Sequence, residues 1–156
     1  MKKATLHTYS PAQTLRLAGL FARLLHGGEI VFLRGPIGAG KTVFVKGVAA
    51  ELGLTSSPTS ASFSLLKKYQ NKHTRLFHVD LFRLEETEVF NLGFEEMLED
   101  EQAIILAEWP DPIARMLPAD RLEINFVLQE ADARTLELSS FGRVSDRLLE
   151  GLCAQG

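Results

Sequence analysis

The sequence predicts a single α/β domain over residues 1–156, with a mixed, mostly parallel sheet that is flanked by helices and carries an antiparallel hairpin. Three observations lead to this prediction. Short apolar runs at Ile30–Leu33 and Ala103–Ala107 are bounded by turn residues, as strands buried on both faces are. Amphipathic stretches with helical spacing alternate with the apolar runs. A chain of 156 residues has room for one domain, and no repeat or linker divides it.

The first half of the chain alternates helix and strand. Ser10 suits a helix N-cap and Pro11 the first turn, whereas a Gly-Gly pair is typical of a helix end. The expected elements are a helix from Pro11 to Gly27-Gly28, a strand at Ile30–Leu33, a glycine-rich turn at 35–40, a helix from Lys41 to Leu52 and a polar loop at 54–62.

The second half contains hairpin signals, because alternating apolar stretches lie on either side of polar turns. The expected elements are strands at Phe63–Tyr69 and Leu76–Leu81 around the turn 70–74, one helix from Glu85 to Leu98 interrupted at Gly93 or two short helices there, a strand at Ala103–Ala107, an antiparallel pair at Arg121–Leu128 and Arg134–Leu138, and a helix at Asp146–Leu152. Four phenylalanines of this half are expected in the core: Phe77, Phe82, Phe90 and Phe94.

Charge and composition limit the classes of function. The formal net charge of −3 argues against a domain that holds nucleic acid by itself, because phosphate binding usually needs a basic face. We therefore expect any contact with RNA to be indirect, through a partner. No apolar run approaches the ~20 residues of a membrane helix, and we identify no export signal after Met1. A single cysteine, Cys153, fits a reducing cytoplasm.

One motif carries the functional inference. The segment Gly35-Pro36-Ile37-Gly38-Ala39-Gly40-Lys41-Thr42 matches G-x-x-x-x-G-K-[ST], and it lies between an expected buried strand and an expected helix. Glycines let successive backbone N–H groups point at phosphate oxygens, and the helix N-terminus adds positive charge. In such loops the lysine reaches the β- and γ-phosphates and the hydroxyl after it binds Mg²⁺. The motif predicts a nucleotide-binding P-loop and therefore a P-loop NTPase fold.

Two acidic residues follow buried strands and are candidates for the chemistry. Asp80 ends the run from Leu76, and Glu108 ends the run from Ala103. Open α/β sheets place ligand sites at the carboxyl ends of strands. We expect Lys41, Asp80 and Glu108 to be catalytic, while His78 is interpreted as a strand histidine rather than a base.

The bound nucleotide is expected to be ATP with Mg²⁺. Guanine-specific GTPases usually carry an N-K-x-D motif that reads the base. The only similar segment, Asn71-Lys72-His73-Thr74, has threonine in place of the aspartate.

With these residues the chain resembles the TsaE (YjeE) family, small P-loop ATPases of bacterial tRNA threonylcarbamoyladenosine (t6A) synthesis. The blocks that carry the resemblance are Gly35–Thr42 with Phe44-Val45-Lys46-Gly47, Phe63-Ser64-Leu65-Leu66 with Tyr69, His78-Val79-Asp80-Leu81-Phe82-Arg83-Leu84, Leu92-Gly93-Phe94-Glu95-Glu96 and Glu108-Trp109-Pro110. The resemblance implies an ATPase that resets a TsaB–TsaD complex between turnovers, while TsaD modifies an adenosine next to the tRNA anticodon.

The resemblance also implies the site residues. Thr42 and Glu108 resemble the Mg²⁺ ligands, and Asp80 would orient water or metal. The implied nucleotide contacts are Pro11, Gly38, Ala39, Gly40, Lys41, Thr42, Val43, Trp109 and Arg134. One segment departs from the family pattern. The family usually has a Ser-Pro-Thr-Phe/Tyr motif after the P-loop helix, and this motif aligns with Ser60-Ala61-Ser62-Phe63, where Ala61 and Ser62 replace the proline and the threonine.

Two other functions remain open. A small-molecule kinase could have this length and a P-loop, and Arg115 and Arg121 flank a short proline-containing loop that would have to act as its lid. A nucleotide-sensing module without significant turnover is the third alternative. Release of free phosphate without a phosphorylated acceptor separates the ATPase from the kinase.

Overall fold

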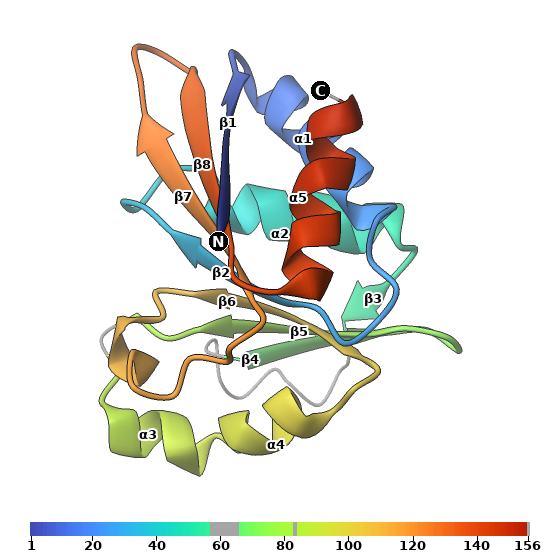
Figure 1. Ribbon diagram of the computed structural model, residues 1–156, viewed down its shortest axis with the longest axis vertical. Coiled ribbons are helices and arrows are strands. Elements are labelled where there is room, and N and C mark those ends of the chain that lie inside the picture. The colour runs from blue at the N-terminus through green and yellow to red at the C-terminus, as the bar shows by residue number, and fades with distance from the viewer. Residues whose placement is uncertain (57–65, 83, 156) are drawn as a thin grey trace.

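The computed structural model describes residues 1–56, 66–82 and 84–155, which form one eight-stranded sheet with helices on both faces (Figure 1). The strands are β1 (Lys2–Thr8), β2 (Ile30–Arg34), β3 (Thr55–Ser56), β4 (Leu66–Gln70), β5 (Arg75–Asp80), β6 (Ala103–Glu108), β7 (Leu122–Leu128) and β8 (Arg134–Ser140). The helices are α1 (Pro11–Ala22), α2 (Lys41–Glu51), α3 (Glu86–Asn91), α4 (Phe94–Glu99), the short 3₁₀ turn η2 (Asp111–Ile113) and α5 (Arg143–Gln155).

The sheet has the order β1-β8-β7-β2-β6-β5-β4-β3. Pairing is parallel along β7-β2-β6-β5 and antiparallel at both edges. Because β8 and β4 each reverse direction between two strands, the other six strands all run the same way. The predicted mixed, mostly parallel sheet and the predicted β4–β5 hairpin are therefore confirmed.

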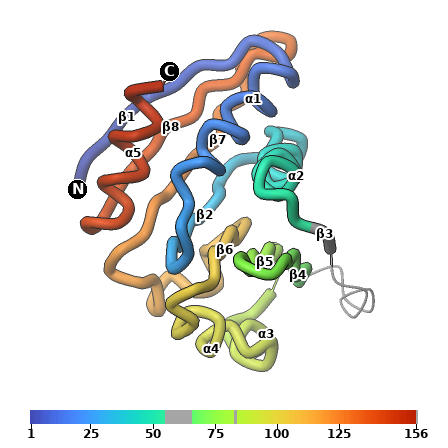
Figure 2. Tube along the Cα trace, turned by 90° about the vertical axis from the view of Figure 1, so that its right-hand side faces the viewer, coloured from blue at the N-terminus to red at the C-terminus, as the bar shows by residue number. Residues whose placement is uncertain are grey.

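Each face of the sheet has its own hydrophobic core. Alternate residues of one strand point to opposite faces, so Val31 and Leu33 pack in the core under α1, α2 and α5, whereas Phe32 packs in the core under α3, α4 and η2. Figure 2 shows the helices separated in this way along the sheet. The first core contains Phe44, whose ring contacts those of Phe21 and Phe126. It fixes α2, and with it the loop that leads into α2.

Most predicted elements are confirmed, with shifts at their ends. Ser10 caps α1, its hydroxyl accepting from Gln13 N at 3.2 Å, but the helix ends at Ala22 instead of Gly27. Beyond Ala22 the last turn tightens, with Leu24 N donating to Phe21 O and Leu25 N to Ala22 O, and buried Glu29 then accepts from His26 N and Gly27 N, both at 2.8 Å. Gly93 interrupts the predicted 85–98 helix with φ +74°, which divides it into α3 and α4.

The structure also differs from the sequence-based prediction at other positions. The strand β1 was not predicted, and it pairs with β8 along its whole length at the edge of the sheet. The closing helix α5 begins at Arg143, three residues before the predicted start. Phe90, expected in the core, is 61% exposed. The predicted strand start at Phe63 lies outside the described residues.

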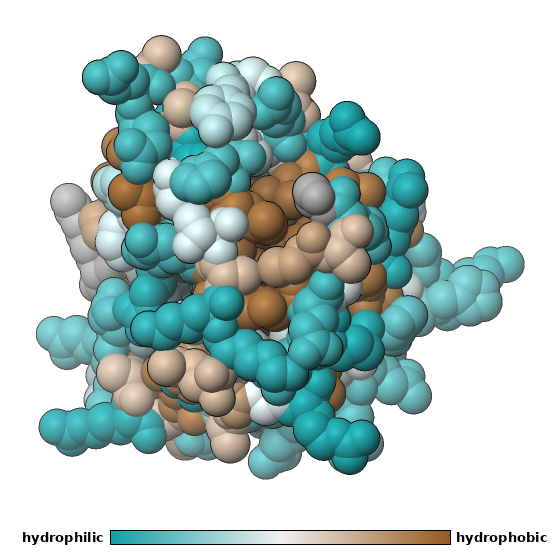
Figure 3. All heavy atoms as spheres, turned by 45° about the horizontal axis from the view of Figure 1, so that its top comes forward, coloured by the Kyte–Doolittle hydropathy of each residue, from teal (hydrophilic) through white to brown (hydrophobic). Residues whose placement is uncertain are grey.

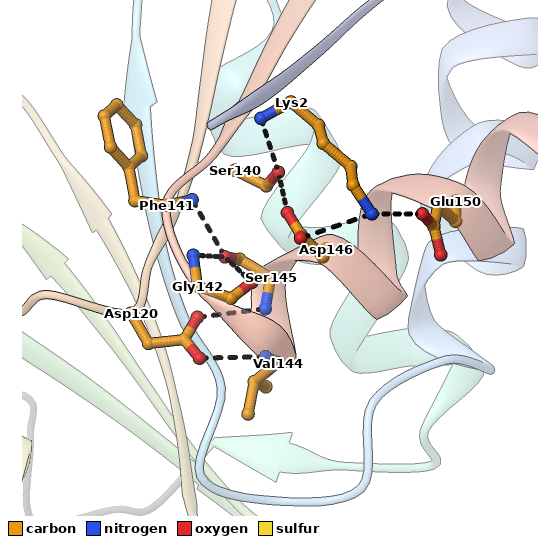
Figure 4. A network of polar contacts seen from close by, with 9 residues as sticks. All are labelled: Lys2, Asp120, Ser140, Phe141, Gly142, Val144, Ser145, Asp146 and Glu150. Atoms are coloured by element: carbon orange, nitrogen blue, oxygen red, sulfur yellow. Dashed lines mark hydrogen bonds and ion pairs between the residues drawn. The ribbon is translucent and has the colours of Figure 1, made fainter.

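A polar network fastens α5 to the sheet (Figure 4). The Asp120 carboxylate accepts from Val144 N at 2.8 Å and Ser145 N at 3.0 Å, which satisfies N–H groups of the first helical turn. The Asp146 carboxylate accepts from the Ser140 hydroxyl and pairs with Lys2 of β1 at 3.3 Å. Three separate stretches of the chain are therefore joined at the start of α5.

Some apolar side chains that pack against the first core are also partly exposed at the surface of the molecule. Ala4, Leu6, Leu20 and Leu24 pack against it and are only partly buried. In Figure 3 the top of the molecule as drawn in Figure 1 is turned toward the viewer, and apolar residues lie near the centre of this face with hydrophilic residues around them. Within residues 1–56, 66–82 and 84–155 no helix is both long and apolar enough to span a bilayer.

Candidate functional site

The glycine-rich segment forms a loop between β2 and α2. Gly35 has φ +128°, and a Cβ there would lie 2.5 Å from the carbonyl oxygen of Phe126, so only glycine fits. Gly40 is the N-cap of α2 with φ +101°, and Phe44 N donates to Gly40 O at 2.9 Å to begin the helical hydrogen bonds. The loop thus has the left-handed backbone and the helix N-terminus that an anion site requires.

Lys41 turns back onto this loop. Its Nζ donates to the carbonyl oxygens of Gly35 at 2.6 Å and Pro36 at 2.9 Å, and lies 4.4 Å from the centre of the Trp109 ring. Burial lowers the pKa of Lys41, and the nearby Glu108 and Asp80 carboxylates partly oppose this effect. The ammonium group is therefore held at the pocket wall by weak, exchangeable acceptors, close to where phosphate oxygens would lie.

Glu108 is the most enclosed acidic group of the site, with 3% of its surface exposed. Its Oε1 accepts from the Thr42 hydroxyl at 3.3 Å, and its Oε2 lies 3.2 Å from His78 Nε2. His78 is a strand histidine, as expected, and its ring faces this carboxylate. A buried carboxylate is costly unless it is paired, so the arrangement keeps Glu108 oriented toward Thr42.

Asp80 lies beside Glu108 because β5 and β6 pair in parallel register and end together. One Asp80 oxygen accepts from Phe82 N at 3.0 Å, and the side chain lines the same pocket as Glu108. The carboxyl ends of two adjacent strands therefore bring two acidic side chains to one place, as the sequence pattern predicts.

Trp109 has a strained backbone, with φ +58°. Left-handed backbone at a bulky residue costs about 1–3 kcal/mol and persists where surrounding contacts enforce it. Here Trp109 N donates to Leu33 O at 3.0 Å, and the indole ring packs on Phe82 with ring centres 4.9 Å apart. The strain turns the ring out of the sheet and over Lys41.

These side chains line one pocket of about 370 Å³. Its walls are Ile37, Gly38, Gly40, Lys41, Thr42, Val43, Asp80, Phe82, Glu108 and Trp109. Phe82 was expected in the core and is instead a half-buried wall of this pocket. Its place in the sequence, two residues after Asp80, is the signal by which it could have been found.

A second pocket of about 200 Å³ lies on the other side of the glycine loop. Its walls are Pro11, Thr14, Gly38, Ala39, Gly40, Val43, Asp132 and Arg134. Pro11 and Arg134 therefore lie near the loop but apart from the acidic residues. The Arg134 guanidinium donates to Ala131 O at 3.1 Å and Ala133 O at 2.8 Å. Thr14 and Asp132 were missed, although each lies two or three residues from a predicted contact.

The donor set around Glu108 fits a hard divalent cation. Mg²⁺ prefers oxygen ligands, keeps several waters and needs only one or two protein carboxylates. The Thr42 hydroxyl and the buried Glu108 carboxylate supply oxygen atoms 3.3 Å apart at the pocket wall, and Asp80 is adjacent. Within the described ranges no cluster of three or more His, Cys, Asp or Glu side chains forms an alternative metal site.

The features that would support other nucleotide enzymes have different roles here. Arg121 donates to Glu123 and Pro118 O and its guanidinium lies 3.8 Å from the Phe141 ring centre, so it is fixed rather than available as a lid. Asn71 stabilises the hairpin turn, its side chain accepting from His73 N and Thr74 N at 2.8 Å. The altered segment Ser60–Phe63 lies outside the described residues.

Comparisons with known proteins agree with the resemblance seen in the sequence. The sequence model of the family described as "Threonylcarbamoyl adenosine biosynthesis protein TsaE" matches residues 8–136. A Bacillus subtilis protein named tRNA threonylcarbamoyladenosine biosynthesis protein TsaE is 34% identical over 152 residues, 97% of this chain and 95% of that protein. A Treponema pallidum protein of the same name is 38% identical over 70% of this chain and 80% of its own length.

A comparison of structures finds the same family. The crystal structure of Bacillus subtilis YdiB superposes with a TM-score of 0.83 at 31% identity, covering 99% of this chain and 96% of YdiB. This likeness extends over β1, which the sequence patterns did not predict, as well as over the glycine loop. Sequence and fold together confirm the resemblance: the chain belongs to the TsaE family.

Proposed function

We propose that this protein binds and hydrolyses ATP in support of t6A modification of tRNA, acting with a TsaB–TsaD complex that it resets between turnovers. The observation that carries the proposal is the convergence of the loop lysine, a hydroxyl and two strand-end carboxylates on one pocket. Names of relatives from several bacteria supply the pathway. Contact with tRNA would be indirect, since the chain has net charge −3.

Lys41 would exchange its present partners for phosphate oxygens. The carbonyls of Gly35 and Pro36 are neutral acceptors, whereas a polyphosphate offers negatively charged oxygens, which attract the ammonium group more strongly. The backbone N–H groups of residues 38–43 would hold the same phosphates from the helix end. This exchange accounts for a lysine that is already in the pocket but tied to weak acceptors.

Thr42 and Glu108 would hold Mg²⁺. When bound, the ion neutralises charge on the β- and γ-phosphates. His78 keeps the Glu108 carboxylate turned toward Thr42, and Asp80, which lines the same pocket, would orient the attacking water. The Trp109 and Phe82 rings close one wall and limit access of bulk water.

The second pocket would take the nucleoside. Pro11 and Val43 offer apolar surface to a base or ribose, and Arg134 and Asp132 offer polar groups at the rim. Both pockets share Gly38, Gly40 and Val43, so a nucleotide lying across the loop would place its phosphates in the larger pocket. ATP is the proposed nucleotide because the N-K-x-D base-reading motif is missing its aspartate.

Turnover by the isolated chain should be slow. No arginine lines the larger pocket in the part of the chain that the structure describes. An arginine supplied by a partner accelerates related NTPases by roughly 10³–10⁵-fold. We propose that TsaB–TsaD completes the site in this way, in the cytoplasm, where the exposed thiol of Cys153 stays reduced.

A tRNA modification assay tests the pathway. TsaB–TsaD with tRNA, a threonylcarbamoyl donor and ATP should form about one t6A per complex, and adding this protein should allow many. Lys41→Ala should abolish the gain, while Lys46→Ala, an exposed change on the same helix, should keep it. Equal multiple-turnover rates with and without the protein would contradict the resetting role.

A further inference from the structure

The face of the molecule that carries α3 and α4 is strongly acidic. Between Leu84 and Glu101 the sequence has eight acidic residues and no basic one, whereas the rest of the chain has 12 acidic and 17 basic residues. Most of these carboxylates are exposed: Glu85, Glu86, Glu88, Glu95, Glu96, Glu99 and Glu101. Asp100 is an exception, since it pairs with Arg75 at 2.9 Å. The molecule's negative charge is therefore concentrated on one face.

An apolar groove lies within this acidic face. It has a volume of about 570 Å³ and is lined by Glu86, Thr87, Phe90, Asn91, Glu95 and Met116. Phe90 is 61% exposed, although the neighbouring Val89 and Phe94 are fully buried. An exposed aromatic side chain beside a groove, with charged residues at the rim, is the arrangement of a protein interface rather than of a free surface.

The charge of the groove determines what it can bind. Glu86 and Glu95 at its rim repel the phosphates of RNA, and they favour Lys or Arg side chains. In the adjacent loop from η2 to β7, Arg115 is the only exposed basic residue, so this loop adds little positive charge beside the groove. A complementary partner would insert an apolar side chain against Phe90 and Met116 and place basic residues over the glutamates.

The groove is built on the two segments that leave the candidate site. Helix α3 begins six residues after Asp80, and η2 begins two residues after Trp109. Val89 of α3 and Ile113 of η2 share the second core with Val79 of β5 and Ala107 of β6. Because both walls of the groove connect directly to the strand ends that carry Asp80 and Glu108, contact there can affect the site without entering it.

We propose that this α3–η2 groove is a docking surface for a segment of TsaB–TsaD in which an apolar side chain is flanked by Lys or Arg. The inference rests on the proposed function for the identity of the partner. The surface lies on the face of the sheet opposite α1, α2 and α5 (Figure 1), so a partner could occupy it while the nucleotide stays bound.

Isothermal titration calorimetry with purified TsaB–TsaD tests the surface. Phe90→Ser and the double change Glu86→Lys/Glu95→Lys should each weaken binding by about tenfold or more, as loss of an interface anchor does. The double change should also reduce the salt dependence of the affinity. Val144→Ser on α5 and Glu130→Lys in the β7–β8 turn, exposed changes outside the groove, should stay within about twofold of the wild type. Mg-ATP affinity should be unchanged in all of them.

The outcomes separate the two proposals. If the wild type binds TsaB–TsaD and the groove variants bind equally well, the docking surface is wrong and the proposed function stands. If the wild type does not bind, both proposals fail. If light scattering shows a wild-type dimer that Phe90→Ser dissociates, the groove is an interface between copies of this chain, and the proposal is overturned.

Discussion

At the scale of single residues, the site depends on side chains that satisfy one another before any ligand binds. Glu108 is buried between a hydroxyl and an imidazole, and Lys41 is tied to two carbonyl groups. The sequence could predict Lys41, Asp80 and Glu108, because each follows a motif or a strand. It could not predict the partners of Lys41 or the contact of His78 with Glu108, because these depend on how the loop and the strands meet in space.

Replacing Lys41 by alanine should remove most ATP affinity. Loss of a charge-assisted contact to phosphate is worth about 2 kcal/mol or more, or roughly 30-fold in the dissociation constant. Calorimetric titration with Mg-ATP measures the change, and Lys46→Ala is the control because Lys46 is exposed on the same helix. Retention of wild-type affinity by Lys41→Ala would rule out its phosphate contact.

Replacing Glu108 by glutamine should affect the metal more than the nucleotide. The substitution keeps the shape of the side chain but removes the charge that would hold Mg²⁺. We expect ATP affinity in EDTA to stay within about threefold of the wild type, and the gain on adding Mg²⁺ to fall about tenfold or more. If affinity falls equally with and without Mg²⁺, Glu108 is not chiefly a metal ligand.

At the scale of elements, the errors of prediction have physical causes. The strand β1 lies at the sheet edge, so only part of one face is covered and its apolar pattern is weak. The Gly-Gly pair marks a turn rather than the end of α1, because Glu29 accepts from His26 N and Gly27 N, a contact that the helix signals did not indicate. Phe90 was assigned to the core because it is aromatic, but its helix turns it outward. Strands buried on both faces, β2 and β6, were predicted well because every residue before the last one in each strand is apolar.

Close packing of α1 against α2 should make Gly47 sensitive to substitution. A Cβ at Gly47 would lie 2.8 Å from the Ala18 Cβ and 3.2 Å from a Leu15 methyl group. Gly47→Val should therefore lower the free energy of unfolding by about 1–3 kcal/mol. Denaturant unfolding measures it, and Ala50→Val, an exposed β-branched change in the same helix, should cost no more than about 0.5–1 kcal/mol. Equal losses would mean that the helices are not tightly packed there.

The start of α5 should be sensitive to acid. Burial raises the pKa of Asp120, but hydrogen bonds from Val144 N and Ser145 N outweigh it and hold the pKa below 3.8. Since the folded-state pKa is depressed, this stabilisation is present above about pH 3.8. It is lost as the pH falls through the folded-state value. Asp120→Asn should cost about 1 kcal/mol at neutral pH.

Denaturant unfolding at pH 7 and at pH 3 tests this. The cost of Asp120→Asn should shrink at the lower pH, because the wild-type carboxyl group then becomes neutral as well. Asp132→Asn, at an exposed aspartate of the β7–β8 turn, is the control and should have little effect at either pH. A cost that does not change with pH would show that the charge of Asp120 does not stabilise α5.

At the scale of the whole molecule, the order of the sheet determines the function we propose. The alternation of helices and strands predicted the α/β class, but the order of the strands depends on tertiary pairing and could not be read from the chain. That order places β2 next to β6 and β6 next to β5, so the glycine loop, Glu108 and Asp80 meet at one edge. The same edge leads into α3 and η2, which connects the site to the acidic groove.

Phosphate release from Mg-ATP by the wild-type protein, with and without TsaB–TsaD from the same source, tests the central claim most directly. The account predicts slow release by the isolated chain and an acceleration of at least about tenfold in the complex, toward the roughly 10³–10⁵-fold that an arginine supplied by a partner can give. Equal rates in the two conditions, with nucleotide binding intact, would contradict a partner-gated ATPase.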